Sequence, residues 1–200
     1  MKKKELVYCA LLYDLLEKKN ARFTQLGLSR TLGISLCAVH YALSPLVKMG
    51  ALRVFPRGFS VIDARKILLY WASIRTPSRD VVHKTRVDSP IAELERSLPP
   101  GVLFGAYSGY RFRFDDVPAD YSEVYAYAPA HRMEELIHRF PAKEGIPNLI
   151  ILRADPPLER LSDRGTVPVG LLYADLWNLG TWYAKEFIHA LERRFHGVLE

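Results

Sequence analysis

The most constraining feature of the sequence is the segment 24–50, TQLGLSRTLGISLCAVHYALSPLVKMG, which predicts two helices joined by a tight turn. The first helix is expected to begin near Thr24 and to end at Gly33, and the turn includes Ser35. Ser35 is placed to cap the second helix, because its side-chain oxygen can accept a hydrogen bond from a free backbone N–H. The second helix is expected to continue to Gly50, since glycine readily adopts the left-handed conformation that ends helices. The segment is therefore predicted to be a helix-turn-helix.

A predicted β-hairpin follows the second helix directly. Residues 51–63, ALRVFPRGFSVID, form two short alternating runs around the turn Pro56-Arg57-Gly58, which is the pattern of two paired strands. A helix-turn-helix followed by a hairpin with a basic tip is the order of elements in a winged helix. This order predicts DNA binding before any other activity.

The charge is distributed unevenly along the chain. Residues 1–86 contain 16 Lys and Arg and 5 Asp and Glu, a net charge of +11, whereas residues 87–200 contain 12 and 17, a net charge of −5. The basic part is suited to neutralising phosphates and releasing counterions. The acidic part should avoid DNA and is available for another partner. The asymmetry predicts that the two parts have different roles.

Length and composition indicate an ordinary globular protein. The chain has 200 residues, of which 49% are hydrophobic and 25% charged, enough for one large or two modest domains. No apolar run is long enough for a transmembrane helix, and the first residues are expected to form a helix and not a signal peptide. The 2 cysteines are too few for a disulfide framework or a zinc finger, so we expect a reducing, cytoplasmic location.

The expected fold class is α+β, with an N-terminal winged helix followed by a mixed α/β domain. The winged helix is expected over residues 1–75, with a first helix over 3–18 and a last helix over 63–75. Residues 76–90, TPSRDVVHKTRVDSP, are polar with a proline near each end and are expected to be a linker, with a folded continuation of the chain as the alternative. Residues 91–200 are expected to form an effector or protein-interaction domain.

Hydrophobic patterns in the second domain predict both strands and helices. The run PNLIILRAD is continuously apolar, as expected for a strand buried on both faces. The expected elements are strands over 101–114, 122–129 and 147–155, a helix over 130–140, a short strand and a turn of helix over 167–179, and a long helix over 181–195.

The exposed N-terminal face of the second helix of the helix-turn-helix is the predicted recognition surface. A helix fits the major groove, where its polar side chains read base edges, and arginines of the hairpin are expected to contact phosphates or the adjacent minor groove. Pro45 bends the far end of this helix and leaves the N-terminal half unaffected. A winged helix that only mediates protein contacts is the alternative, which the clustered positive charge disfavours. The expected DNA-binding residues are Ser35, Leu36, Cys37, His40, Tyr41, Ser44 and Lys48 in the helix, and Arg53 and Arg57 in the hairpin.

A glycine-containing turn is predicted at Gly105-Ala106, and Glu123 begins the next strand with Tyr125 at i+2. This arrangement resembles the scaffold of polymerase-β-type nucleotidyltransferases, in which a Gly-Ser turn grips a phosphate and carboxylates at i and i+2 hold Mg²⁺. Here alanine replaces the serine, and one carboxylate cannot clamp two metal ions. We therefore expect no transferase activity, no metal and no cofactor. An unrelated α/β sheet with a glycine-containing strand is the alternative.

The C-terminal segment 171–191, LLYADLWNLGTWYAKEFIHAL, places Asp175-Leu176 before an alanine-containing final helix. Together with the winged-helix pattern and the strand ending in VYAYAP, it resembles the antitoxin regulators of abortive-infection, AbiEi-type, type IV toxin–antitoxin systems. The resemblance implies a repressor whose second domain counters a nucleotidyltransferase toxin. Asp175 itself is expected to be a helix cap or part of a buried polar contact.

The favoured hypothesis is a sequence-specific DNA-binding transcriptional regulator that acts as an autoregulating, antitoxin-like repressor. Because one recognition helix reads only a few base pairs, a homodimer on two half-sites is expected. The alternatives are a protein-interaction module that neutralises a nucleotidyltransferase toxin and, less favoured, an active nucleotidyltransferase. Double-stranded DNA and a toxin protein are thus the expected partners.

Overall fold

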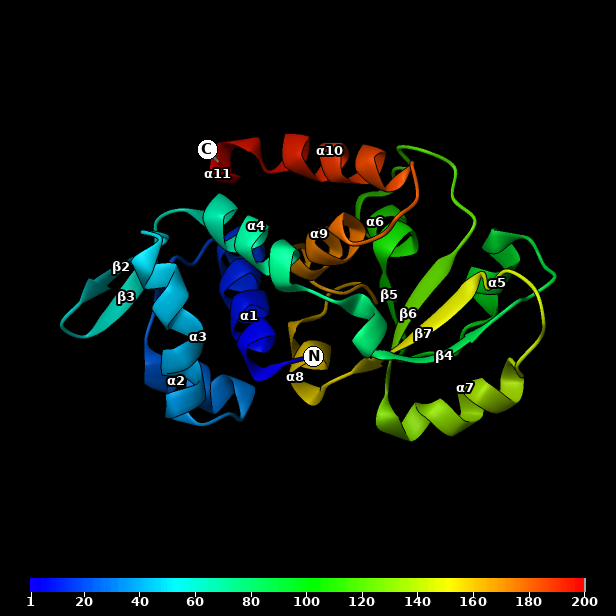
Figure 1. Ribbon diagram of the computed structural model, residues 1–200, viewed down its shortest axis with the longest axis horizontal. Coiled ribbons are helices and arrows are strands. Elements are labelled where there is room, and N and C mark those ends of the chain that lie inside the picture. Colours follow the sequence, from blue (N-terminus) through cyan, green and yellow to red (C-terminus); the bar gives the residue numbers. More distant parts are fainter. Residues whose placement is uncertain (200) are drawn as a thin grey trace.

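The structure is a computed structural model that describes the backbone of residues 1–199 and the side chains of residues 1–197. It has an α+β fold in which a helical unit with a small sheet lies beside a larger sheet (Figure 1). The helix α9 lies between these two parts, and α10 runs across both of them (Figure 1). The helices are α1 (Lys3–Lys18), α2 (Gln25–Leu32), α3 (Leu36–Lys48), α4 (Ala64–Ile74), α5 (Ile91–Ser97), α6 (Ala106–Phe114), α7 (Met133–Arg139), α8 (Pro156–Leu161), α9 (Val169–Trp177), α10 (Ala184–Arg194) and α11 (His196–Leu199), with 3₁₀ turns η1 (Pro77–Arg79) and η2 (Ala130–Arg132). The strands are β1 (Arg22–Phe23), β2 (Leu52–Phe55), β3 (Gly58–Val61), β4 (Val81–Thr85), β5 (Leu103–Gly105), β6 (Val124–Pro129) and β7 (Leu149–Ala154).

The N-terminal unit has the order of elements predicted for a winged helix. Helices α1, α2 and α3 precede the hairpin β2–β3, and α4 follows with Asp63 as its cap, where the Lys66 N–H donates to the Asp63 carboxylate at 2.9 Å. The first helix has the predicted bounds, Lys3–Lys18. The strand β1 was not predicted, because its 2 residues are too short to show an alternating pattern. It pairs with β3 and completes a sheet of order β1-β3-β2.

The larger sheet has the strand order β4-β7-β6-β5, and hydrophobic cores lie against both faces of its central strands. The central strands β6 and β7 are parallel, and the outer pairs are antiparallel. Side chains alternate between the two faces of a strand. In β6, Val124 and Ala126 face a cluster that includes Leu94 of α5 and Leu136 of α7, whereas Tyr127 belongs to the core on the opposite face. That second core continues into the winged helix.

The expected linker over residues 76–90 is not a free connection. It contains η1 and β4, and β4 pairs antiparallel with β7 as the outer strand of the larger sheet. The prediction was wrong because an outer strand with one solvated face needs only a weak hydrophobic pattern: Val82 and Lys84 are exposed, and only Thr85 is buried. The chain therefore passes from the winged helix into the sheet without a flexible spacer.

Two segments that were predicted to contain strands are mainly helical in the structure. Only Leu103–Gly105 of the segment 101–114 is a strand, and Ala106–Phe114 is α6. The aromatic residues of α6 pack at helical spacing, with Tyr107 and Tyr110 both against Phe187 of α10 at ring-centroid distances of 5.0 and 5.4 Å. The segment 167–179 forms α9, whose residues from Val169 to Leu176 are all buried. A helix buried on every side shows no apolar stripe, so its period cannot be identified from sequence.

The winged helix and the remainder of the chain pack closely through α9. Gly170 lies against α1 and α4: a Cβ at this position would approach the Leu12 side chain to 2.9 Å and Trp71 to 3.4 Å. Leu12 and Trp71 are fully buried and belong to the same core as residues of the larger sheet. The two parts expected as separate domains thus share one continuous hydrophobic core.

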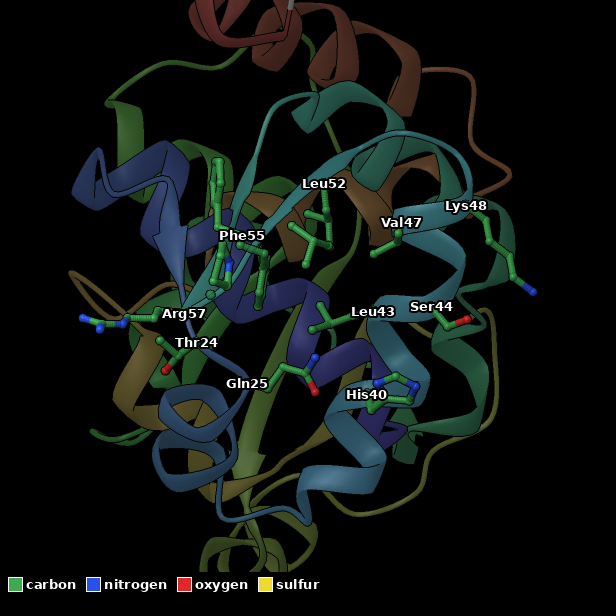
Figure 2. Close-up of a pocket in the computed structure, with 14 residues that line it drawn as sticks. Thr24, Gln25, His40, Leu43, Ser44, Val47, Lys48, Leu52, Phe55 and Arg57 are labelled. Carbon is green, nitrogen blue, oxygen red and sulfur yellow. The ribbon is translucent and has the colours of Figure 1, made fainter.

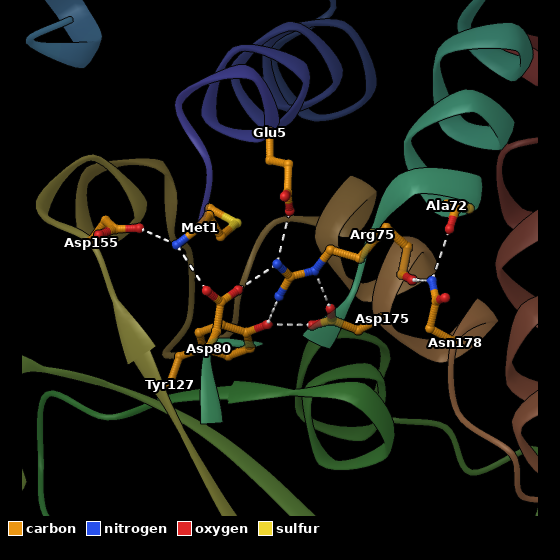
Figure 3. Close-up of polar contacts among 10 residues, drawn as sticks. Met1, Glu5, Ala72, Arg75, Asp80, Tyr127, Asp155, Asp175 and Asn178 are labelled. Carbon is orange, nitrogen blue, oxygen red and sulfur yellow. Dashed lines mark hydrogen bonds and ion pairs between the residues drawn. The ribbon is translucent and has the colours of Figure 1, made fainter. Parts of the chain in front are cut away.

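A buried ion cluster centred on Arg75, the residue after α4, lies at this junction (Figure 3). Its guanidinium donates to Asp175 at 2.9 Å, to Glu5 at 2.8 Å and to Asp80. It also donates to the Tyr127 hydroxyl at 2.8 Å, which in turn donates to Asp175 at 2.6 Å. Asp175 lies in the last turn of α9, so it is a buried polar contact and not the start of a helix. The cluster ties α1, α4, α9 and β6 together.

Further polar contacts continue the cluster on two sides. The amine of Met1 lies 2.6 Å from Asp155 and 3.1 Å from Asp80. On the other side, the Asn178 side-chain amide donates to the Ala72 carbonyl at 2.9 Å (Figure 3). The end of α4 is therefore held to the end of α9 by both charged and neutral hydrogen bonds.

Cys9 is buried within α1, and Cys37 is exposed near the start of α3; neither forms a disulfide. Burial raises the pKa of the Cys9 thiol, so this group stays protonated and packs as a small apolar side chain. None of the helices in the described part of the chain has the length and apolar character needed to span a bilayer.

Candidate nucleic-acid interface

Local hydrogen bonds set the geometry of the helix-turn-helix. The helix α2 is capped by Thr24, whose side chain accepts from the Gly27 N–H at 2.9 Å, and it ends at Gly33 with a left-handed φ of 65°. After the turn, Ser35 caps α3 by accepting from the Ala38 N–H at 3.2 Å. These contacts confirm the predicted turn, and they fix the angle at which α3 leaves it.

One face of α3 is anchored in the core, and the opposite face is open. Val39, Ala42, Leu43 and Leu46 are buried, and the Tyr8 hydroxyl of α1 donates to the Ala42 carbonyl at 3.0 Å. The open face carries two large hydrophobic side chains that are exposed to solvent: Tyr41 is 72% exposed and Leu36 is 50% exposed. Cys37, His40 and Lys48 are also exposed, and Ser44 is half-buried.

A groove separates α3 from the hairpin. The hairpin Leu52–Val61, called the wing from here on, has the two-residue loop Pro56-Arg57, since Phe55 pairs directly with Gly58. The groove has a volume of about 500 Å³ and an apolar floor. Figure 2 shows its polar rim, on which the charged ends of Lys48 and Arg57 extend outward on opposite sides. The rim residues are Thr24 and Gln25 from the start of α2, His40, Ser44 and Lys48 from α3, and Arg57 from the wing.

The surface around the groove has no acidic side chain over a long stretch of sequence. From Lys18 through Ile62 the chain contains no Asp or Glu but 7 Lys and Arg, Lys18 included. All 7 are exposed. Within the described part of the chain none of these 7 side chains forms an ion pair, so their positive charge is available to attract a polyanion.

A second basic row crosses the wing sheet beside the groove. Ser60 of β3 is in register with Arg22 of β1 on one side and with Arg53 of β2 on the other. Residues directly opposite each other on antiparallel strands project from the same face. The two arginines therefore flank Ser60 on the solvent face of the sheet.

The structure brings some of the predicted site residues together and separates others. His40, Ser44, Lys48 and Arg57 share the groove. The cap residue Ser35 and three residues of α3, Leu36, Cys37 and Tyr41, lie outside the groove. Arg53 belongs to the basic row of the wing. Sequence reasoning missed Arg22, Thr24 and Gln25. These residues join the site only because tertiary packing brings the wing close to the start of α2. The sequence pointed to one of them, Thr24, and only as the start of a helix.

Two acidic side chains of the segment that resembles a nucleotidyltransferase scaffold, Asp116 and Glu123, are engaged in other contacts. The Glu123 carboxylate accepts from the Tyr183 hydroxyl, and Asp116 forms an ion pair with Arg194 at 2.7 Å. Among the described residues, no group of three or more His, Cys, Asp or Glu side chains is arranged to hold a metal ion. The turn after β5 places Ala106 at a left-handed φ of 44°.

Comparison with known proteins adds no family to this description. No protein-family model matches the chain, and no curated protein matches it either.

Proposed function

We propose that this protein is a sequence-specific DNA-binding transcriptional regulator. The observation that carries the proposal is the exposed face of α3 beside the wing, in a surface with 7 Lys and Arg and no Asp or Glu from Lys18 to Ile62. A helix of this length fits the major groove, and the wing is positioned to follow the adjacent backbone. Burial of the opposite face of α3 leaves its polar side chains as the natural contacts for bases.

The side chains divide into base-reading and phosphate-binding groups. His40 and Ser44 on α3 and Gln25 on α2 have polar tips at the groove that can donate or accept hydrogen bonds, which suits contacts with base edges. Lys48 and Arg57 extend outward from its two sides (Figure 2), which suits contacts with phosphates on both sides of a DNA groove. Phosphate contacts position the protein, and base contacts supply the specificity.

We also propose that the protein binds as a homodimer to an inverted repeat. One α3 helix contacts only a few base pairs, whereas two half-sites about one helical turn apart multiply the specificity. Repression of its own promoter follows from the resemblance to antitoxin regulators and is part of the same proposal.

The test is a binding titration on the DNA upstream of the protein's own coding region, against scrambled DNA of the same length, at two salt concentrations. We expect tighter binding to the upstream DNA and weakening of that preference in His40→Ala. Equal and steeply salt-dependent binding to both DNAs would reduce the proposal to a basic surface without specificity. Absence of binding to either DNA at about 50 mM salt would refute it.

A matched pair of variants separates the interface from general charge. Lys48→Gln/Arg57→Gln removes two positive charges from the groove, and Arg96→Gln/Lys185→Gln removes two exposed charges from α5 and α10. The first pair should abolish most of the affinity and the second should leave it nearly unchanged. Equal losses would mean that net charge, and not this surface, drives binding.

A second candidate function is binding of a protein partner, such as a nucleotidyltransferase toxin, through the acidic part of the chain. The specific observation is Trp182, which is 73% exposed in the connection between α9 and α10. Exposed tryptophans are frequent anchors of protein interfaces. Co-purification of a stoichiometric protein encoded beside this one, lost in Trp182→Ala, would support this function; unchanged recovery in the variant would contradict the assignment to this residue.

A further inference from the structure

A cleft lies at the junction between the winged helix and the larger sheet. It has a volume of about 620 Å³, within the range of small-molecule sites. One wall is the end of α4 and the turn η1, from Arg75 to Ser78, and another is Asn178-Leu179 after α9. The floor is the face of the larger sheet. The cleft is separate from the groove beside α3, because the two share no lining residue.

The floor of the cleft is a row of three side chains across three strands. Lys84 of β4 is in register with Ile150 of β7, and Ile150 is in register with Tyr125 of β6. In-register side chains share a face, and neighbouring strands lie about 4.8 Å apart, so the Lys84 and Tyr125 backbones are roughly 10 Å apart. The row therefore has a cationic end, an aliphatic middle and an aromatic end.

The polar groups of the cleft favour a negatively charged occupant. Its lining contains Arg75 and Lys84 but no Asp or Glu. Arg75 is occupied by its own carboxylates, whereas Lys84 has no hydrogen bond or ion pair within the described residues and is exposed. Burial raises the pKa of Tyr125, so its phenol stays protonated and can donate a hydrogen bond at neutral pH. Ser78 on η1 adds an exposed hydroxyl.

We propose that this cleft binds a small aromatic anion, with its negative group at Lys84 and its planar body over Ile150 toward Tyr125. The span of roughly 10 Å fits one or two fused rings that carry one carboxylate, sulfonate or phosphate. A charge-assisted hydrogen bond to Lys84 supplies the orientation, and the apolar floor supplies the buried area. An uncharged aromatic compound lacks the first contribution and binds independently of Lys84.

The test uses 8-anilinonaphthalene-1-sulfonate as the aromatic anion and N-phenyl-1-naphthylamine as its uncharged counterpart, both followed by fluorescence titration. We expect one sulfonate probe per chain. Lys84→Gln should lower the affinity for the sulfonate probe about tenfold, which is the effect of losing one charge-assisted hydrogen bond. The same variant should leave the affinity for the uncharged amine probe unchanged. Ser78→Trp places a large side chain at the rim of the cleft and should abolish both. Lys185→Gln, an exposed lysine of α10, is the matched control and should change neither.

Each alternative outcome is decisive. Sulfonate binding that is the same in Lys84→Gln and Ser78→Trp would place the probe elsewhere and overturn the proposal. If Lys84→Gln lowered the affinities for both probes equally, Lys84 would act through the shape of the cleft and not through its charge. That result would overturn the proposal that Lys84 binds the negative group. Absence of a single-site titration in the wild-type protein would overturn the site itself. Thermal melting of each variant verifies that it is folded.

The position of the cleft also links it to DNA binding, and this part rests on the proposed function. Its wall is the end of α4, which follows the wing directly, and α4 is fixed to α1 and α9 through Arg75. If occupancy alters this packing, saturating DNA should change the affinity for the sulfonate probe, and the probe should change the affinity for DNA by the same factor. Unchanged affinities would refute the link but not the site. Failure to bind DNA would refute the proposed function, while the probe titration would still decide the site.

Discussion

The guanidinium of Arg75 donates to the carboxylate of Asp175 at 2.9 Å, across 100 residues of sequence. Arg75 directly follows α4 of the winged helix, and Asp175 belongs to the last turn of α9. Because both side chains are buried, each carries a desolvation cost that only the other and their shared partners offset. The pair fastens the end of α4 to α9, and the Tyr127 hydroxyl, which contacts both side chains, extends the connection to β6 of the larger sheet.

Arg75→Met should lower the free energy of unfolding by about 3–5 kcal/mol, because it leaves Glu5, Asp80 and Asp175 without their common cation. Urea unfolding measures the loss. Arg132→Gln is the control: its ion pair with Glu135 is solvent-exposed, and its removal should cost about 0–1 kcal/mol. A loss below about 1 kcal/mol in Arg75→Met would contradict the role given to the cluster.

Gly58→Ala should disturb the wing. A Cβ at Gly58 would lie 2.4 Å from the Phe23 carbonyl oxygen of β1, so the β1–β3 pairing must shift. We expect a loss of about 1–3 kcal/mol in stability and weaker DNA binding. Gly180→Ala, where nothing lies within 4 Å of the added Cβ, is the matched control. Chemical unfolding together with the DNA titration gives the answer, and wild-type behaviour of both variants would show that the wing tolerates the shift.

Lys48→Ala and His40→Ala should affect DNA binding in different ways. A phosphate contact contributes equally to all sequences, so Lys48→Ala should lower affinity uniformly and reduce the slope of log K against log salt by about 1. A base contact contributes to one sequence, so His40→Ala should cost about 1–3 kcal/mol on the preferred DNA and little on scrambled DNA. Anisotropy titrations at several salt concentrations distinguish the two patterns. The assignments would have to be exchanged if the two variants behaved in the opposite manner.

Stability should fall in alkali. Burial, reinforced by a hydrogen bond to Glu95, raises the pKa of Tyr121 to about 12, whereas the unfolded value is near 10. Between these two pH values the folded state therefore retains a proton that the unfolded state releases. The contribution of Tyr121 to the free energy of unfolding is fully present below pH 10 and is lost as pH rises from 10 to 12. Tyr121→Phe should move the alkaline unfolding midpoint upward. Ultraviolet absorbance of tyrosinate, followed alongside circular dichroism, should show ionisation together with unfolding; a downward shift of the midpoint would contradict the assignment.

Local signals allowed part of the candidate site to be predicted. Ser35 and Asp63 cap their helices as expected, and the loop Pro56-Arg57 joins the wing strands. Each of these features depends on residues that are neighbours in the chain. The contribution of Gln25 to the groove has no such signal, because it arises only where the wing approaches the start of α2.

The same distinction applies to the whole molecule. Adjacent residues and composition determine several features, which can be predicted without a structure. These are the starts and ends of helices, the turn before α3 and the excess of positive charge in the first part of the chain. Three other features could not be predicted from the sequence: that α9 is a helix, that β4 belongs to the larger sheet, and that Arg75 pairs with Asp175. A helix buried on all sides has no amphipathic period, an outer strand has only a weak one, and two charges far apart in the chain meet only because packing brings them together.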